Sequence, residues 1–146
     1  MEQRVNIQAA QPQAFKAMLG LESYLQTTQL SKIQKELIKI RASQINGCAF
    51  CIDMHTRDAR KLGETEQRIY LLNAWRETDL FTEEEKTLLA LTEEVTLINA
   101  NGVTDKTYQR AEQLFGKEYV AQIIMAIVTI NAWNRIAIST KMEPAK

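Results

Sequence analysis

The stretch Glu36-Leu-Ile-Lys-Ile-Arg-Ala-Ser-Gln-Ile-Asn-Gly-Cys48-Ala-Phe-Cys51-Ile-Asp-Met-His55 decides how this chain folds. Its first half repeats apolar residues at helical spacing, and its Asn46-Gly47 pair is a helix-stop signal. A second helix then begins near Cys48, so we expect two antiparallel helices joined by a tight turn. The same stretch holds both cysteines and the only histidine of a 146-residue protein.

Helix formers also dominate the rest of the chain, and with five Gly and two Pro in all, no segment alternates like a strand. Caps and stop signals place the expected helices at Pro12 to about Gln26, Ser31 to about Gln44, Cys48 to Gly63, Thr65 to about Glu77, Thr82 to Asn101, Thr104 to Gly116 and Lys117 to about Thr140. The sequence therefore predicts one all-α domain over residues 1–146, a compact bundle of about six to seven helices.

Composition excludes several classes of function. Lys and Arg number 18, as do Asp and Glu, so the balanced charge gives no sign of a nucleic-acid or polybasic membrane surface. The N-terminus lacks a basic region followed by an apolar one, and the longest uncharged run, Tyr119 to Asn134, falls short of the roughly 20 residues a bilayer needs. We expect a cytoplasmic protein, in which a Cys-x-x-Cys is catalytic or binds metal rather than being structural.

The cysteines and the histidine share one face of the third expected helix. At about 100° per residue the inward side carries Cys48, Cys51, Ile52, His55, Ala59 and Leu62, and the outward side carries Asp53, Arg57, Arg60 and Lys61. Cys51 and His55 form an i,i+4 pair, within hydrogen-bond reach directly or through one water. Cys48 lies at the helix N-terminus, where the helix dipole favours a thiolate.

Glu36 is the unusual residue of the preceding helix. It borders the apolar stripe of Ile33, Leu37 and Ile40, whereas its Lys neighbours are expected on the polar side. In an antiparallel pair Glu36 faces His55. This arrangement predicts a relay in which the carboxylate orients the imidazole, the imidazole takes a proton from a thiol, and the thiolate attacks.

Two other interpretations of these residues stay open. Each of them alone is an ordinary residue of a core or a solvated face, although their joint spacing argues against that. Alternatively Cys48, Cys51 and His55 supply three zinc ligands, with Glu36 or water as the fourth. Structural zinc sites normally use two separated pairs of ligands, and the second pair is missing here.

The pattern Glu-x11-Cys-x2-Cys-x3-His, followed by Arg-Asp-Ala-Arg-Lys-Leu-Gly, resembles the alkylhydroperoxidase D-like branch of the carboxymuconolactone decarboxylase superfamily. Two further segments are similar to sequences of the same branch: Arg41-Ala-Ser-Gln-Ile-Asn-Gly47 and Asn131-Ala-Trp-Asn-Arg135. Four chemically meaningful positions at fixed spacing make this signal specific. One departure is Phe50, because the best-known members carry a second histidine immediately before the second cysteine.

The resemblance implies an all-helical thiol-dependent peroxidase that assembles as a trimer or hexamer. Cys51 would attack an alkyl hydroperoxide with help from His55 and Glu36, and Cys48 would resolve the sulfenic acid to a Cys48–Cys51 disulfide. A dithiol donor, such as a lipoyl group or a thioredoxin-like protein, would reduce the disulfide again. No flavin, haem or metal is required.

Three other functions remain as alternatives. They are a redox-sensing subunit without fast turnover, a zinc-stabilised helix bundle, and a lactone decarboxylase or isomerase. The decarboxylases of the superfamily do not rely on a cysteine pair, so the two thiols argue against that chemistry. Trp75, Trp133, Leu71 and Leu72 are candidates for an interface or a pocket lining, with ordinary core as the alternative.

Overall fold

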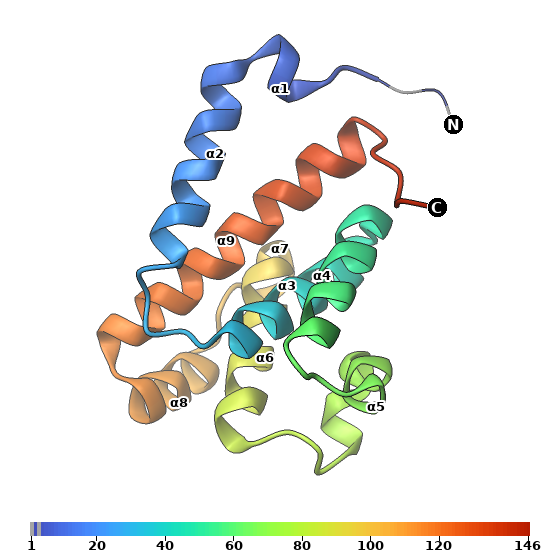
Figure 1. Cartoon of the computed structure of the whole chain (residues 1–146). Helices are drawn as coiled ribbons and strands as arrows, with labels where there is room; N and C mark the ends of the chain where they lie inside the picture. The colour runs from blue at the N-terminus through green and yellow to red at the C-terminus, as the bar shows by residue number, and fades with distance from the viewer. Residues whose placement is uncertain (1, 3) are drawn as a thin grey trace.

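The computed structural model describes residues 2 and 4–146, so Met1 and Gln3 of the N-terminal segment lie outside the described residues. Within the described residues every regular element is a helix, which confirms the predicted all-α fold (Figure 1). In chain order the helices are α1 (Ile7–Ala10), α2 (Pro12–Leu25), α3 (Lys32–Asn46), α4 (Ala49–Lys61), α5 (Glu66–Tyr70), the 3-10 helix η1 (Leu72–Glu77), α6 (Glu83–Thr96), α7 (Ile98–Asn101), α8 (Asp105–Phe115) and α9 (Lys117–Ser139).

The α3–α4 pair is defined at both ends by its sequence. Ser31 and Gln34 form a capping box at the start of α3, with bonds of 3.0 and 2.9 Å between the side chain of each residue and the backbone N–H of the other. Gly47 ends α3 at φ 70°, a left-handed conformation that glycine adopts without steric cost. The predicted turn at Asn46-Gly47 is therefore confirmed, and α4 runs back along α3.

Helix α3 is central to the fold, packed against α4, α6 and α9. Leu37, Ile38 and Ile40 are fully buried, so α3 buries more than the single stripe that the sequence predicts. The facing sides of α6 and α9 supply Leu88, Leu89, Leu91, Ile123, Ile127 and Ile130, all with 0–1% of their surface exposed. Each such side chain contributes about 1.5–3 kcal/mol through burial.

The helix count is higher than predicted because two expected helices are each divided in two and the short helix α1 precedes Pro12. The segment from Thr65 to Glu77 divides into α5 and η1, which meet at Leu71 with φ −96° and ψ 5°. The Thr82 helix ends at Thr96 instead of Asn101, and Ile98 lies in α7 with 57% of its surface exposed. The expected helix from Thr82 to Asn101 is thus divided into α6 and α7.

Glu94 holds the start of α8 near the end of α6. Its Oε1 accepts a 2.8 Å hydrogen bond from the backbone N–H of Thr104, the N-cap of α8. Burial raises the pKa of Glu94, but hydrogen bonds from Thr107 and Thr104 outweigh it, so the pKa lies below its ordinary value. The carboxylate therefore stabilises this connection in its charged form.

Helix α9 is long and apolar enough to cross a bilayer by length and composition alone. It is instead a major packing element, in contact with α2, α3, α4, α6 and α8. Figure 1 shows it crossing the molecule beside α2, with the two helices diverging towards the end that carries the chain termini. Of the interface candidates, Leu72 and Trp75 are core residues, Leu71 is 37% exposed, and Trp133 packs edge-on against Phe15 of α2.

Candidate active site

The two cysteines form a disulfide at the start of α4. Cys48 is the N-cap residue, and its Sγ accepts a 3.3 Å hydrogen bond from the backbone N–H of Cys51. Only 1–2% of the surface of each cysteine is exposed. Because both sulfurs are engaged in this bond, the zinc site that uses both thiolates is not formed in this state.

The hairpin brings Glu36 of α3 against His55 of α4. Nδ1 of His55 lies 3.1 Å from Oε2 of Glu36, and both residues are 8% exposed. A carboxylate only accepts hydrogen bonds, so Nδ1 carries the proton and Nε2 is left as the basic nitrogen. This is the tautomer that a base for a thiol needs.

A lysine completes the surroundings of the carboxylate. Nζ of Lys39 lies 3.8 Å from Oε1 of Glu36 and 3.8 Å from Oε2 of Glu22, with its side chain 14% exposed. The sequence places Lys39 on the polar side of α3, and there its side chain lies over Glu36 instead of extending into solvent. The ammonium group therefore lies between the carboxylates of Glu36 and Glu22.

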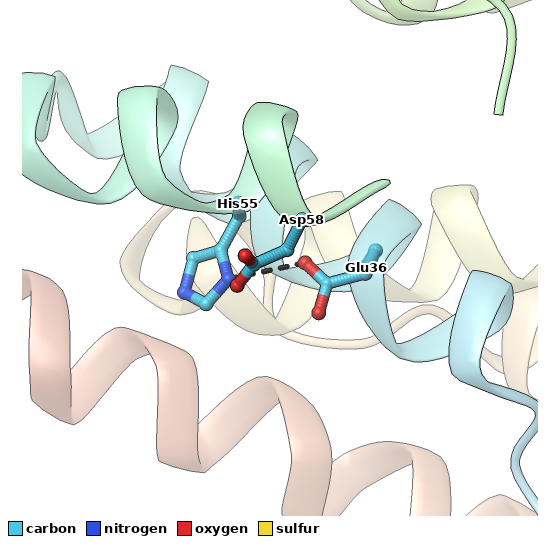
Figure 2. Close-up of side chains that lie close together, drawn as sticks. All are labelled: Glu36, His55 and Asp58. Atoms are coloured by element: carbon cyan, nitrogen blue, oxygen red, sulfur yellow. Dashed lines mark hydrogen bonds and ion pairs between the residues drawn. The ribbon is translucent and has the colours of Figure 1, made fainter. Parts of the chain in front are cut away.

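Asp58, a residue that no sequence motif singled out, lies beside the Glu36–His55 pair. It follows His55 by three residues on α4, and Figure 2 shows its carboxylate next to the imidazole and to Glu36. One donor atom from each of the three side chains lies within 4.8 Å of the others. The i,i+3 spacing was the available signal, since it places two side chains on one helix face.

An apolar cavity of about 450 Å³ opens onto the cysteine and the histidine. Its lining includes Cys51 and His55 but not Cys48. Most of the remaining wall is aromatic or aliphatic, supplied by Phe15, Phe50, Met54, Trp133, Ile136 and Met142. A cavity of this size and character suits a small organic molecule. The N-terminal segment also contributes, through residues 5–8, and no sequence signal pointed to this contribution.

A second, polar cavity of about 640 Å³ lies on the other side of the carboxylate. Glu36 and Asp58 line it, together with Lys32, Lys35 and Lys61, whereas His55 and Cys51 do not. Lys39 and Glu22 line both cavities. The Glu36–His55 pair therefore separates an apolar space, which adjoins the sulfur, from a polar one.

The segment from Asn131 to Arg135 of α9 holds the end of α3 in place and supplies part of the wall of the apolar cavity. Nδ2 of Asn46 donates to Oδ1 of Asn131 and of Asn134, each at 2.9 Å, and Asn134 donates to Oγ of Ser43. The carbonyl of Ser43 in turn accepts from the N–H of Cys48 at 3.0 Å. These bonds tie α9 to the turn that carries the first cysteine.

The expected inward face of α4 is largely as the sequence predicts. Cys51, His55 and Ala59 are buried, and Cys48 is buried just before the helix. Ile52 is only half-buried, and Leu62, the C-cap residue, is 40% exposed. Because α4 ends at Lys61, the helical periodicity that predicted an inward Leu62 no longer applies at that residue.

Comparison with known proteins places these features in a family. The model of the carboxymuconolactone decarboxylase family matches residues 12–94. A protein of Bacillus subtilis (strain 168), the uncharacterized protein YdfG, is 48% identical over 139 residues, which is 95% of each chain. A crystal structure from Agrobacterium tumefaciens, described as a protein of unknown function and a candidate antioxidant-defence protein of the AhpD type, is 41% identical, with TM-score 0.95 over 99% of both chains.

A more distant structure shares the fold alone. The debrominase Bmp8, solved with 2,3,4-tribromopyrrole, is 15% identical, with TM-score 0.84 over 94% of this chain and 73% of its own. At this identity the fold does not carry a substrate from one protein to the other.

Proposed function

Because this chain belongs to the carboxymuconolactone decarboxylase family and carries a cysteine pair beside an apolar cavity, we propose that it is a thiol-dependent peroxidase that reduces alkyl hydroperoxides. One observation carries the proposal: Cys51 and His55 line the same cavity, while Cys48 is bonded to Cys51 and is absent from that lining. A bulky hydroperoxide in the cavity contacts the sulfur of Cys51 and the imidazole of His55 but not Cys48.

The reaction begins with the reduced protein. Nε2 of His55 takes the thiol proton of Cys51, and Glu36 holds the imidazolium through Nδ1. The thiolate attacks the distal oxygen of ROOH, the O–O bond breaks, and the alkoxide leaves with the proton returned by His55. The products are ROH and a sulfenic acid on Cys51.

Cys48 then completes the cycle. Its thiol attacks the sulfenic acid, water leaves, and the Cys48–Cys51 disulfide forms. A dithiol donor, for which a lipoyl group or a thioredoxin-like protein is suitable, reduces the disulfide and becomes a disulfide itself. This cycle needs a reducing compartment, so the proposal includes a cytoplasmic protein with an antioxidant role.

The proposal also includes a homo-oligomer, a trimer or a hexamer. Several large apolar side chains on α2 and α9 are exposed in the single chain, among them Leu19 (47%), Val128 (43%) and Ile138 (44%). Such residues favour burial against another copy. Light scattering of the purified protein checks the subunit number, and a monomer at micromolar concentration would contradict this part.

Intact-mass spectrometry tests the chemistry directly. Reduced protein is mixed with one equivalent of cumene hydroperoxide, and the wild type is expected to lose about 2 Da as the disulfide closes. Cys48→Ser is expected to gain about 16 Da, because sulfenic acid is trapped on Cys51. Cys51→Ser is expected to keep its mass.

The same experiment separates the alternatives. An unchanged wild-type mass after several minutes would reject the peroxidase. A gain of mass in Cys51→Ser instead of Cys48→Ser would reverse the roles of the two thiols. Turnover of a lactone acid that survives thiol blocking would indicate the decarboxylase, and slow disulfide formation accompanied by a change in oligomer size would indicate a redox sensor.

A further inference from the structure

We propose that Glu36, His55 and Asp58 form a binding site for a divalent transition-metal ion of the zinc type, and that the ion switches off thiol activation at His55. Two carboxylates and an imidazole from two packed helices make up the site (Figure 2). Carboxylate oxygen and imidazole nitrogen are ligands that zinc binds readily in proteins. The inhibitory part of the proposal rests on the proposed peroxidase, whereas the binding part does not.

The geometry is close to that of a metal site. The donor atoms all lie within 4.8 Å of one another, and zinc bonds of about 2.0–2.2 Å place ligand atoms roughly 3.4 Å apart in a tetrahedron. Rotation of the carboxylate groups about their terminal torsions, which are broad and soft, provides the remaining approach. A water molecule from the polar cavity supplies the fourth ligand.

The lack of a partner for the Asp58 carboxylate is the observation that points to an ion. Its half-buried carboxylate makes no hydrogen bond or ion pair with any residue of the described chain, although it lies beside the Glu36 carboxylate. Two neighbouring carboxylates repel each other unless a cation lies between them. Lys39 contacts Oε1 of Glu36 at 3.8 Å, which leaves Oε2 available to an ion on the His55 side.

The polar cavity is the route by which an ion reaches the site. Glu36 and Asp58 line this cavity, and Cys51 does not. A bound ion therefore leaves the apolar cavity open to the hydroperoxide. We expect zinc to lower kcat with little change in KM.

The inhibition follows from the tautomer of His55. Zinc on Nδ1 replaces the proton that this nitrogen donates to Glu36. The neutral imidazole then carries its proton on Nε2, which becomes a donor and can no longer accept the thiol proton of Cys51. The ion thus blocks the base without touching the sulfur.

Zinc binding is measured first on the oxidised protein, in which the disulfide removes both thiols as competing ligands. Titration calorimetry is expected to show about one ion per chain, and Asp58→Asn is expected to weaken the affinity by about 10- to 100-fold or more. Asp53→Asn is the matched control, because it removes the same charge from α4 at a position paired with Arg57 instead. Its affinity is expected to equal that of the wild type.

Peroxidase assays of the reduced protein then test inhibition, with each variant compared with its own zinc-free rate. Zinc is expected to inhibit the wild type and Asp53→Asn, and about tenfold more zinc or above is needed for Asp58→Asn. No saturable binding, or equal affinity in Asp58→Asn, overturns the site. Inhibition that is competitive with the hydroperoxide, or binding without inhibition, overturns the switch. A protein that binds zinc but reduces no hydroperoxide refutes the proposed function and leaves the site standing.

Discussion

Glu36→Gln is the substitution that tests the relay most directly. The amide keeps the size of the side chain and a hydrogen bond to Nδ1 of His55, which lies 3.1 Å from Oε2 in the native protein. It removes the negative charge that stabilises the imidazolium formed when His55 takes the thiol proton of Cys51. We therefore expect slower attack on the hydroperoxide in a folded protein.

The size of the effect follows from the geometry. Replacing a charged by a neutral hydrogen bond costs about 1–1.5 kcal/mol. Full Coulomb attraction between two charges about 4 Å apart gives an upper limit near 4 kcal/mol at an effective dielectric constant of about 20. Lys39, 3.8 Å from the same carboxylate, reduces that limit. An intermediate value of about 2 kcal/mol corresponds to roughly 30-fold slower attack.

The assay isolates the first step. In a Cys48→Ser background, stopped-flow mixing with excess cumene hydroperoxide follows the loss of the Cys51 thiol, and the slope against concentration gives the second-order rate constant. Glu83→Gln is the control, because it makes the same chemical change at an exposed position of α6. A rate constant for Glu36→Gln within about threefold of the wild type, with unchanged melting temperature, would refute the relay.

Three further predictions concern the cavity wall and the framework. Trp133→Ala enlarges the apolar cavity and is expected to raise KM for cumene hydroperoxide about tenfold while leaving that for hydrogen peroxide nearly unchanged, as steady-state assays with both substrates will show. Asn134→Ala removes the hydrogen-bond partner of the Ser43 hydroxyl and one of the two acceptors of the Asn46 amide, which keeps Asn131, so urea unfolding is expected to show a loss of about 1–3 kcal/mol; a loss below about 0.5 kcal/mol would contradict this. Glu94 has a lowered pKa, so its contribution to stability is present above its unfolded-state pKa and is lost as pH falls through the folded one; melting curves of Glu94→Gln are expected to show a weaker decline in acid than those of the wild type.

Local signals predicted the helical framework because they act within a few residues. The helix starts capped by Ser31 and Thr82 and the stop at Gly47 are confirmed, since each depends on hydrogen bonds or dihedral angles of its own turn. The break at Leu71 was missed because Thr65 to Glu77 contains no glycine or proline. There the chain turns so that Leu72 and Trp75 reach the core, a requirement set by tertiary packing alone.

The site was partly predictable for a related reason. Glu36 and His55 come together because one tight turn makes two helices antiparallel, and the Asn46-Gly47 pair predicts that turn. The apolar cavity was not predictable, because its walls come from residues 5–8, α2 and α9, which are far from α4 in the sequence. The position of Lys39 between two carboxylates was not predictable for the same reason, since only the approach of Glu22 from α2 gives it a second acidic partner.

The arrangement of the two cavities explains why a carboxylate and an imidazole are both needed between them. A hydroperoxide requires an apolar space beside the sulfur, whereas a charged base requires polar surroundings, and one side chain cannot satisfy both. His55 presents a ring to the apolar cavity, and Glu36 faces the polar cavity with Lys39 beside it. In the proposed reaction the pair carries charge across the boundary while the hydroperoxide remains in the apolar space. A change to the polar side is expected to act on kcat and a change to the apolar side on KM, so the kinetic behaviour of Glu36→Gln and Trp133→Ala tests this division.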